Sequence, residues 1–141
     1  MTTINPYLTF NGNCEEAFSF YQSIFGGEIP YAGKFKDMPE NAECQVSEED
    51  KEKIMHISLP ISKETILMGS DRTGADQFVE GNNFSISIST DLEEEAVRIF
   101  NALSEDGTID MPLNKTFWGS YFGMLTDKFN IKWMVSAQLK E

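Results

Sequence analysis

The chain has 141 residues, of which 40% are hydrophobic and 24% charged, and its formal net charge is −12. A chain of this length can bury enough apolar surface to fold as a single domain without disulfides or a structural metal. Its 23 acidic and 11 basic residues disfavour nucleic acid and anionic membranes as partners, because acidic groups repel phosphate.

The first half begins with a predicted strand from Tyr7 to Phe10, followed by a helix. Asn13 and Glu16 have the spacing of a capping box at the start of this helix, and Gly26-Gly27 would end it. Apolar residues recur between these points at helical intervals: Cys14, Ala17, Phe18, Tyr21, Ile24 and Phe25. Three predicted strands follow: Glu28 to Phe35, Ile54 to Ile61 and Thr65 to Gly69.

The second half repeats this order. A predicted strand from Phe84 to Ser89 precedes a helix that would be capped by Thr90 or Asp91 and ended by Asp106-Gly107. Three more strands are predicted from Thr108 to Leu113, Tyr121 to Leu125 and Ile131 to Ala137. The helix start Glu15-Glu16-Ala17 reappears as Glu94-Glu95-Ala96, as expected when one supersecondary unit is used twice.

The repeat predicts an α+β domain with two βαβββ modules, at about residues 1–75 and 80–141. One helix per module leaves one sheet face uncovered, so we expect a curved mixed sheet around a cleft where a ligand would bind. Residues 36–53 are acidic and lack apolar periodicity, which favours a mobile, solvated insertion over a calcium loop.

The sequence indicates a cytoplasmic protein. It has no basic segment followed by an apolar run near Met1, and no apolar run near the ~18 residues of a membrane span. Cys14 and Cys44 are predicted to be reduced thiols, although a disulfide between them stays open.

His56 is the only histidine and alternates with Met55 and Ile57 in a predicted strand. In one interpretation His56 and Ser58 face the cleft, where an imidazole could accept a proton or hydrogen-bond a ligand. In the other, which is commoner for a single titrating group, the histidine is satisfied by a neighbouring carbonyl.

Serines and aromatic residues provide further binding candidates. Ser85, Ser87 and Ser89 alternate with apolar residues, so their hydroxyls would face either the cleft or solvent. Trp118 and Tyr121 belong to an aromatic segment that could line a pocket or fill the core and a dimer contact. Trp118 is placed at a turn and is therefore a candidate for the rim of the cleft.

Motifs along nearly the whole chain resemble the PhnB-like family of the glyoxalase, or vicinal oxygen chelate, superfamily. They are Asn5-Pro6-Tyr7-Leu8, Phe10-x-Gly12-Asn13, Glu16-Ala17 with Phe20-Tyr21, Phe25-Gly26-Gly27, Met68-Gly69-Ser70-Asp71, Thr116-Phe117-Trp118, Phe122-Gly123 and Thr126-Asp127-Lys128-Phe129. Asn130 departs from the pattern, because the family turn usually has glycine there. The resemblance implies the paired βαβββ fold and a homodimer.

The resemblance also indicates which residues of this chain would have to bind a metal. Metal-dependent members of the superfamily bind a divalent ion through four strand positions that align here with Pro6, Met68, Ser85 and Met134. A proline, two thioethers and a hydroxyl are not ordinary ligands of such an ion. A register shift of one residue, which brings in Tyr7, does not supply them either. We therefore expect no metal and no cofactor.

Members of this family are often labelled 3-demethylubiquinone-9 3-methyltransferases. That activity requires a site for S-adenosylmethionine, which is usually a glycine-rich turn after the first strand of a doubly wound sheet. Gly26-Gly27 instead follows a helix, so methyl transfer is disfavoured as chemistry for this chain.

Three functional hypotheses remain. The first, which we favour, is a protein that binds a small, partly apolar molecule in a metal-free cleft lined by His56, Met68, Ser85, Ser87, Trp118, Tyr121 and Met134. The second is a superfamily enzyme of the isomerase, lyase or dioxygenase type, which would use an unplaced metal or His56. The third is a structural or regulatory dimer.

Overall fold

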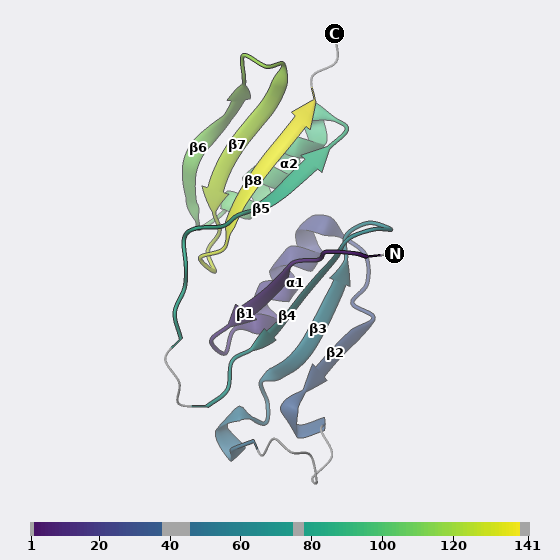
Figure 1. The fold of residues 1–141 in the computed structure, drawn as a ribbon, viewed down its shortest axis with the longest axis vertical. Helices are drawn as coiled ribbons and strands as arrows, with labels where there is room; N and C mark the ends of the chain where they lie inside the picture. Colours follow the sequence, from purple (N-terminus) through teal and green to yellow (C-terminus); the bar gives the residue numbers. More distant parts are fainter. Residues whose placement is uncertain (1, 38–45, 75–77, 139–141) are drawn as a thin grey trace. The chain divides into compact units, whose positions relative to one another are not determined.

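The computed structural model describes residues 2–37, 46–74 and 78–138. The chain divides into two compact units, Met1–Val79 and Glu80–Glu141, each of which has its own sheet and helix. Figure 1 follows the chain through both units from the N-terminus to the C-terminus.

The described residues of unit 1 form one α-helix and a four-stranded mixed sheet. Its elements in chain order are β1 (Tyr7–Phe10), α1 (Cys14–Phe25), β2 (Tyr31–Lys34), β3 (Ile54–Pro60) and β4 (Ile66–Asp71). The strand order is β1-β4-β3-β2, in which β1 and β4 are parallel and the other pairs are antiparallel.

Unit 2 repeats this arrangement. It contains β5 (Ile86–Thr90), α2 (Glu93–Ser104), β6 (Thr108–Lys115), β7 (Ser120–Thr126) and β8 (Lys132–Gln138). The strand order is β5-β8-β7-β6, with β5 and β8 parallel. The predicted α+β fold with two βαβββ modules is confirmed, and the strands form two four-stranded sheets, one in each unit.

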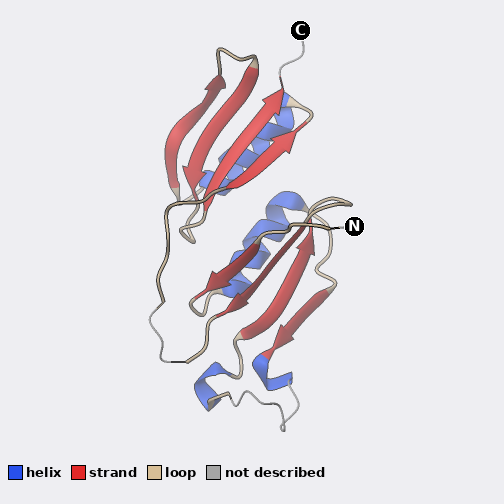
Figure 2. Ribbon diagram, in the orientation of Figure 1, coloured by secondary structure: helices blue, strands red, loops and turns tan. Residues whose placement is uncertain are grey.

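Each helix lies on one face of its own sheet, as Figure 2 shows in blue against red. Close packing is possible because glycines stand under the helices. A Cβ atom on Gly69 of β4 would lie 2.7 Å from the Phe18 ring of α1, and one on Gly123 of β7 would lie 2.7 Å from the Phe100 ring of α2. Phe18 and Phe100 are both buried, so these contacts are part of the core of each unit.

The start of α1 is stabilised by Asp71, the last residue of β4. Its Oδ1 atom accepts hydrogen bonds from the backbone N–H groups of Gly12 (3.0 Å) and Cys14 (2.9 Å), and its Oδ2 atom accepts one from Ile54 (2.9 Å). The predicted capping box was wrong, since Asn13 makes no side-chain capping bond. A carboxylate from a distant strand performs that role because it can bond the free N–H of the first helical residue, the N–H of Gly12 just before the helix and a strand donor together.

The second helix also begins differently from the prediction. Leu92 occupies the N-cap position of α2 and makes no side-chain capping bond, whereas Thr90 Oγ1 donates to the Leu92 carbonyl at 2.9 Å. The acidic first turn, Glu93 to Glu95, is present as expected and complements the helix dipole.

The turn after β7 contains a second buried carboxylate, Asp127. It accepts hydrogen bonds from the backbone of Phe129 and Ile131 and from Trp133 Nε1 at 2.8 Å. Asn130 in this turn has φ = 70°, the left-handed conformation that glycine adopts easily and asparagine tolerates. The departure from the family pattern at this residue is therefore compatible with the turn.

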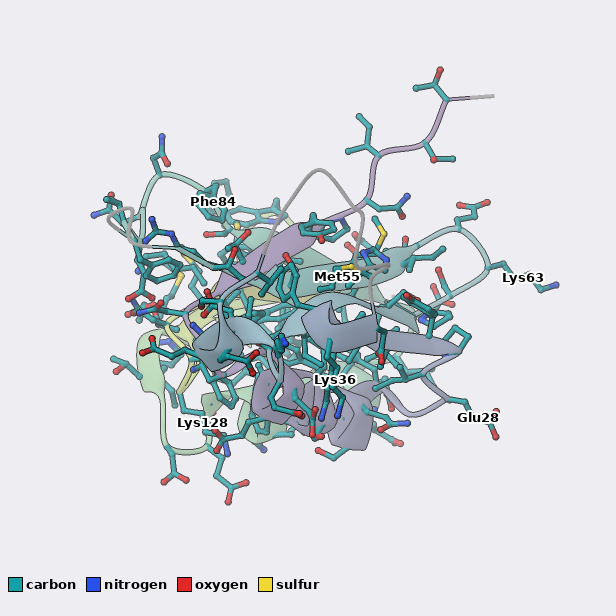
Figure 3. All side chains as sticks on the ribbon, turned by 90° about the horizontal axis from the view of Figure 1, so that it is seen from below. Glu28, Lys36, Met55, Lys63, Phe84 and Lys128 are labelled. Carbon is teal, nitrogen blue, oxygen red and sulfur yellow. The ribbon has the colours of Figure 1, made fainter. Side chains whose placement is uncertain are left out.

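The predicted mobile insertion, residues 36–53, lies partly outside the described residues, at 38–45. The described parts include two 3₁₀ turns, Phe35–Asp37 and Glu48–Asp50. Lys36 and Lys34 form ion pairs with Glu52 at 3.0 and 3.2 Å, and these contacts lower the pKa of Glu52. Other loops expose their charges, as do Glu28 and Lys63, which project outward in Figure 3.

Among the described residues, no helix has the length and apolar character to cross a bilayer.

Replacing Asp71 with asparagine should destabilise the protein by about 2 kcal/mol or more. The amide offers one acceptor oxygen where three N–H groups now bond a carboxylate, and its own NH₂ would face a buried donor. Denaturant unfolding of Asp71→Asn measures the loss, with Asp91→Asn as control, because Asp91 is exposed. Equal stability of the two variants would contradict the structural role of Asp71.

Candidate functional site

The helix-free face of the unit 1 sheet carries a row of side chains from all four strands. Tyr7 of β1 pairs with Met68 of β4, Met68 pairs with Ser58 of β3, and Ser58 pairs with Tyr31 of β2. Their neighbours Leu8, Leu67 and Leu59 are buried. Because side chains alternate between the two faces of a strand, the row points away from α1.

His56 lies on this face between two tyrosines. Its Nδ1 atom is 3.4 Å from the Tyr7 hydroxyl, and its ring centroid lies 5.7 Å from the Tyr7 ring and 5.9 Å from the Tyr31 ring. Tyr7 and Tyr31 are 48% and 49% exposed, so about half of each ring is open to a ligand. We call Tyr7, His56 and Tyr31 the aromatic cluster.

Gly33 allows Tyr31 to reach this position. Gly33 is two residues from Tyr31 on β2 and pairs with His56 of β3. A Cβ atom on Gly33 would collide with the hydroxyl end of Tyr31, whose ring therefore lies back over the glycine. The missing side chain thus leaves space for Tyr31 beside His56.

The corresponding face of unit 2 is lined by sulfur and hydroxyl groups. Ser87 of β5 pairs with Met134 of β8, which pairs with Met124 of β7, which in turn pairs with Met111 of β6. One step along the sheet, the hydroxyls of Ser89 and Ser136 are 3.4 Å apart. This face therefore has no charged group in its central row.

Trp118 lies in the turn between β6 and β7, as expected, and is 57% exposed. Its ring stands edge-on to Phe117 at 4.9 Å, and the Phe122 ring of β7 is 6.2 Å away. The other indole, that of Trp133, is buried and donates to Asp127. An apolar molecule in contact with this turn would meet Trp118 and not Trp133.

The structure brings some predicted site residues together and separates others. His56 and Met68 share the helix-free face of unit 1, and Ser87 and Met134 are direct partners on that of unit 2. Ser85 precedes β5 and is exposed. Tyr121 lies on the α2 side of β7, where a hydrogen bond to Glu93 raises the pKa of its phenol.

The four positions aligned with superfamily metal ligands do not form a suitable donor set. On β1, Tyr7 and not Pro6 points to the helix-free face, and the Pro6 carbonyl accepts from the Met68 N–H at 3.1 Å. The matching pair in unit 2 is Ser87 and Met134. In the part of the chain that the structure describes, no three His, Cys, Asp or Glu side chains are grouped to hold a metal. A phenol, a hydroxyl and two thioethers do not fit a hard or borderline divalent ion.

Two other groups that could react or bind a ligand, the Cys14 thiol and the N-terminus of α1, have structural roles in this fold. Cys14 is fully buried, and burial first, then the charges of Asp71 and Glu15, raise the pKa of its thiol, so it stays neutral. The N-terminus of α1 could in principle bind an anion, but the Asp71 carboxylate already bonds its N–H groups. Neither feature is open to a ligand.

The sequence prediction of the site missed one member and underrated another. Tyr31 received no role, because nothing in its local pattern shows that its ring folds back toward His56. Tyr7 entered only as a register alternative to Pro6. The glycine two residues after Tyr31 was the available signal, since an aromatic residue can lie across a strand where a neighbour on the same face has no side chain.

The sequence profile of the 3-demethylubiquinone-9 3-methyltransferase family matches residues 2–136. The chain is 32% identical to Protein YjdN of Escherichia coli (strain K12) over 140 residues, which cover 95% of this chain and 94% of that protein.

Solved structures are similar along the whole chain. The crystal structure of protein PA1353 from Pseudomonas aeruginosa superposes with a TM-score of 0.86 at 43% identity, and the match covers 99% of this chain and 100% of that one. A PhnB protein from Bacillus cereus, described as a putative 3-demethylubiquinone-9 3-methyltransferase, has a TM-score of 0.74 at 27% identity, with coverage of 99% and 100%. A glyoxalase/bleomycin resistance protein/dioxygenase family enzyme from Burkholderia phytofirmans PsJN shares the fold, with a TM-score of 0.62, 13% identity and coverage of 96% and 97%.

Gly33→Ala should displace the Tyr31 ring from His56, since the added Cβ takes the place of the hydroxyl end of Tyr31. The single histidine makes this measurable by NMR, because its ring protons sense the ring currents of both tyrosines. We expect these resonances to move in Gly33→Ala and to stay in place in Ala32→Ser, whose side chain lies on the other face. Unmoved resonances in both variants would show that Tyr31 does not contact His56.

The purified protein should carry no stoichiometric zinc, nickel, iron or manganese. The aligned positions hold Tyr7 and Met68 in unit 1 and Ser87 and Met134 in unit 2, and none of these side chains is an ordinary ligand of these ions. Elemental analysis after exhaustive dialysis provides the measurement. About one such ion per chain would overturn the alignment of the ligand positions.

Proposed function

The chain belongs to the 3-demethylubiquinone-9 3-methyltransferase (PhnB-like) family, which has the glyoxalase/bleomycin resistance fold, and we propose that it binds a small, partly apolar molecule without a metal. The helix-free sheet faces are the binding surfaces in this proposal. The observation that carries it is the aromatic cluster, in which two half-exposed tyrosines flank the only histidine.

The chemistry of these faces suits a molecule with an apolar body and a few polar groups. Tyrosine rings bury large apolar areas, and their hydroxyls still donate or accept hydrogen bonds. Met68 and Ser58 adjoin the aromatic cluster in the same row, so thioether and hydroxyl groups stand beside the rings. A pocket of this composition, apolar with a small number of placed polar groups, is typical of small-molecule sites.

The family description does not by itself assign methyl transfer to this chain. Each unit has the strand order first, fourth, third, second with a helix on one face, and not a doubly wound parallel sheet. The turn between β1 and α1 contains Gly12, but its N–H bonds Asp71. The positions where a nucleotide-like cofactor would usually find free N–H groups are therefore used by the protein itself.

The second candidate is an enzyme that uses His56 for proton transfer. The contact between Tyr7 and His56 favours it, because a phenol at 3.4 Å can orient the imidazole and select its tautomer. Superfamily chemistry of the isomerase or lyase type would need such a group in the absence of a metal. Binding without turnover remains our first choice, since no carboxylate contacts His56 among the described residues.

A ligand that binds the helix-free face of unit 2 should change the tryptophan fluorescence of the protein. An apolar molecule at the β6–β7 turn would desolvate the half-exposed Trp118, whereas Trp133 is buried already. Trp118→Phe should remove most of the signal, and Ser87→Val should weaken binding by about 1 kcal/mol, roughly fivefold, if the Ser87 hydroxyl bonds the ligand. Screening a library of neutral aromatic and aliphatic compounds provides the titration.

His56→Gln separates the two candidates. Glutamine keeps hydrogen-bonding capacity but cannot exchange a proton near neutral pH, so a binding protein should retain its affinity within a few-fold. If a compound that binds the protein is converted to product, and conversion disappears in His56→Gln, the enzyme proposal replaces the binding proposal.

We also propose that two copies of the chain associate. β6 is an edge strand with an exposed apolar residue, Ile109, at 50% exposure, and Phe117 in the next turn is 97% exposed. Unpaired strand edges and apolar surface of this kind are usually covered by a partner. Light scattering should give about twice the 16.0 kDa chain mass, and a monomer throughout the micromolar range would contradict the proposal.

A further inference from the structure

Three methionines stand side by side across the unit 2 sheet. Met111 of β6 is the direct partner of Met124 of β7, at a point where the β6–β7 register shifts on both sides of Met111, and Met124 is the direct partner of Met134 of β8 in a regular ladder. The fourth position of this row is Ser87 of β5. Paired residues on neighbouring strands point to the same face, so the three thioethers form one lateral row, which we call the methionine row.

The methionine row lies on the face opposite α2. Gly123 and Leu125, which flank Met124, are buried on the helix side, as are Trp133 and Val135 beside Met134. Met124 and Met134 are half-buried, and Met111 is 47% exposed. The three side chains are therefore partly open to solvent, while the middle of the row is partly screened from water.

We propose that the methionine row binds a soft monovalent cation, Cu(I), through the thioethers of Met111, Met124 and Met134. Thioether sulfur is a poor ligand for hard divalent ions but selects Cu(I). Backbones of paired strands are about 4.5–5.5 Å apart, and methionine has three rotatable bonds. The two outer side chains can thus lean over the middle one and bring their sulfur atoms onto one ion.

The surroundings of the methionine row attract cations, and the three side chains of the row are soft ligands. Two charged residues at one end of the sheet, Asp110 and Lys132, are bridged by Thr126, which donates to Asp110 at 2.8 Å and accepts from Lys132 at 3.3 Å. That carboxylate is therefore already engaged. The net charge of −12 raises the local concentration of cations around the protein. The site goes beyond the small-molecule proposal, because it needs only unit 2 and can be tested without the organic ligand.

The test is a competition between the protein and the chromophoric chelator bicinchoninate for Cu(I), under anaerobic, reducing conditions. Cys44→Ser protein is the background, since a free thiol binds Cu(I) strongly, whereas the other thiol, Cys14, is buried and neutral. We expect one Cu(I) per chain. Met124→Leu should weaken binding at least tenfold, and Met55→Leu, in unit 1, should leave it unchanged.

A second measurement shows where the ion sits. In protein labelled with ¹³C at the methionine methyl groups, Ag(I), a diamagnetic soft analogue, should shift the signals of Met111, Met124 and Met134 and leave those of Met55 and Met68. Leucine replaces methionine with little change in volume, so Met124→Leu should keep its fold and its far-UV spectrum. Unchanged Cu(I) affinity in Met124→Leu, or Ag(I) shifts outside the methionine row, would overturn the proposal.

Discussion

The single helix of each unit covers one face of a four-stranded sheet, and the period-two alternation of the strands then divides every strand between two environments. On one face, Leu8, Leu67 and Leu59 are buried against α1, and Val135 and Leu125 against α2. On the other face, every second residue is free of the packing demands of the core. The aromatic cluster and the methionine row both lie on that second face, and both depend on the register that the first face imposes.

In each unit the register of the strands is maintained by the parallel pair, β1 with β4 in unit 1 and β5 with β8 in unit 2. In unit 1, β1 and β4 are joined by a regular ladder from Tyr7 and Met68 to Phe10 and Asp71. Asp71 then bonds both the start of α1 and the start of β3, so one carboxylate connects three elements. A one-residue slip would move Asp71 away from these donors and expose Leu67 in place of Met68. The contents of the helix-free face are thus tied to a buried hydrogen-bond network on the opposite side.

Much of the fold followed from the sequence because its signals were local and repeated. The strand and helix order, the helix stripes such as Phe18 and Tyr21, and the alternation that places Ser87 on the helix-free face all depend on short-range periodicity. The predictions failed where a residue far away in the sequence determines the local structure. Asp71 replaces Asn13 as the cap of α1, and the Tyr121 phenol turns to Glu93 of α2, which a strand pattern alone does not reveal. Ser85 lies outside β5 because the strand begins at Ile86 and not at the predicted Phe84.

The two halves of the repeat carry different side chains on the face that is not packed against a helix. Equivalent ladder positions hold Tyr7 and Met68 in unit 1 and Ser87 and Met134 in unit 2. Unit 1 adds a histidine and a second tyrosine, whose approach depends on Gly33, whereas unit 2 adds two more methionines in the same row. Rings and hydroxyls favour an organic molecule, and thioethers favour soft, polarizable partners. The same substitutions that make the faces unsuitable for a hard divalent ion therefore give each unit a different binding chemistry on the same backbone.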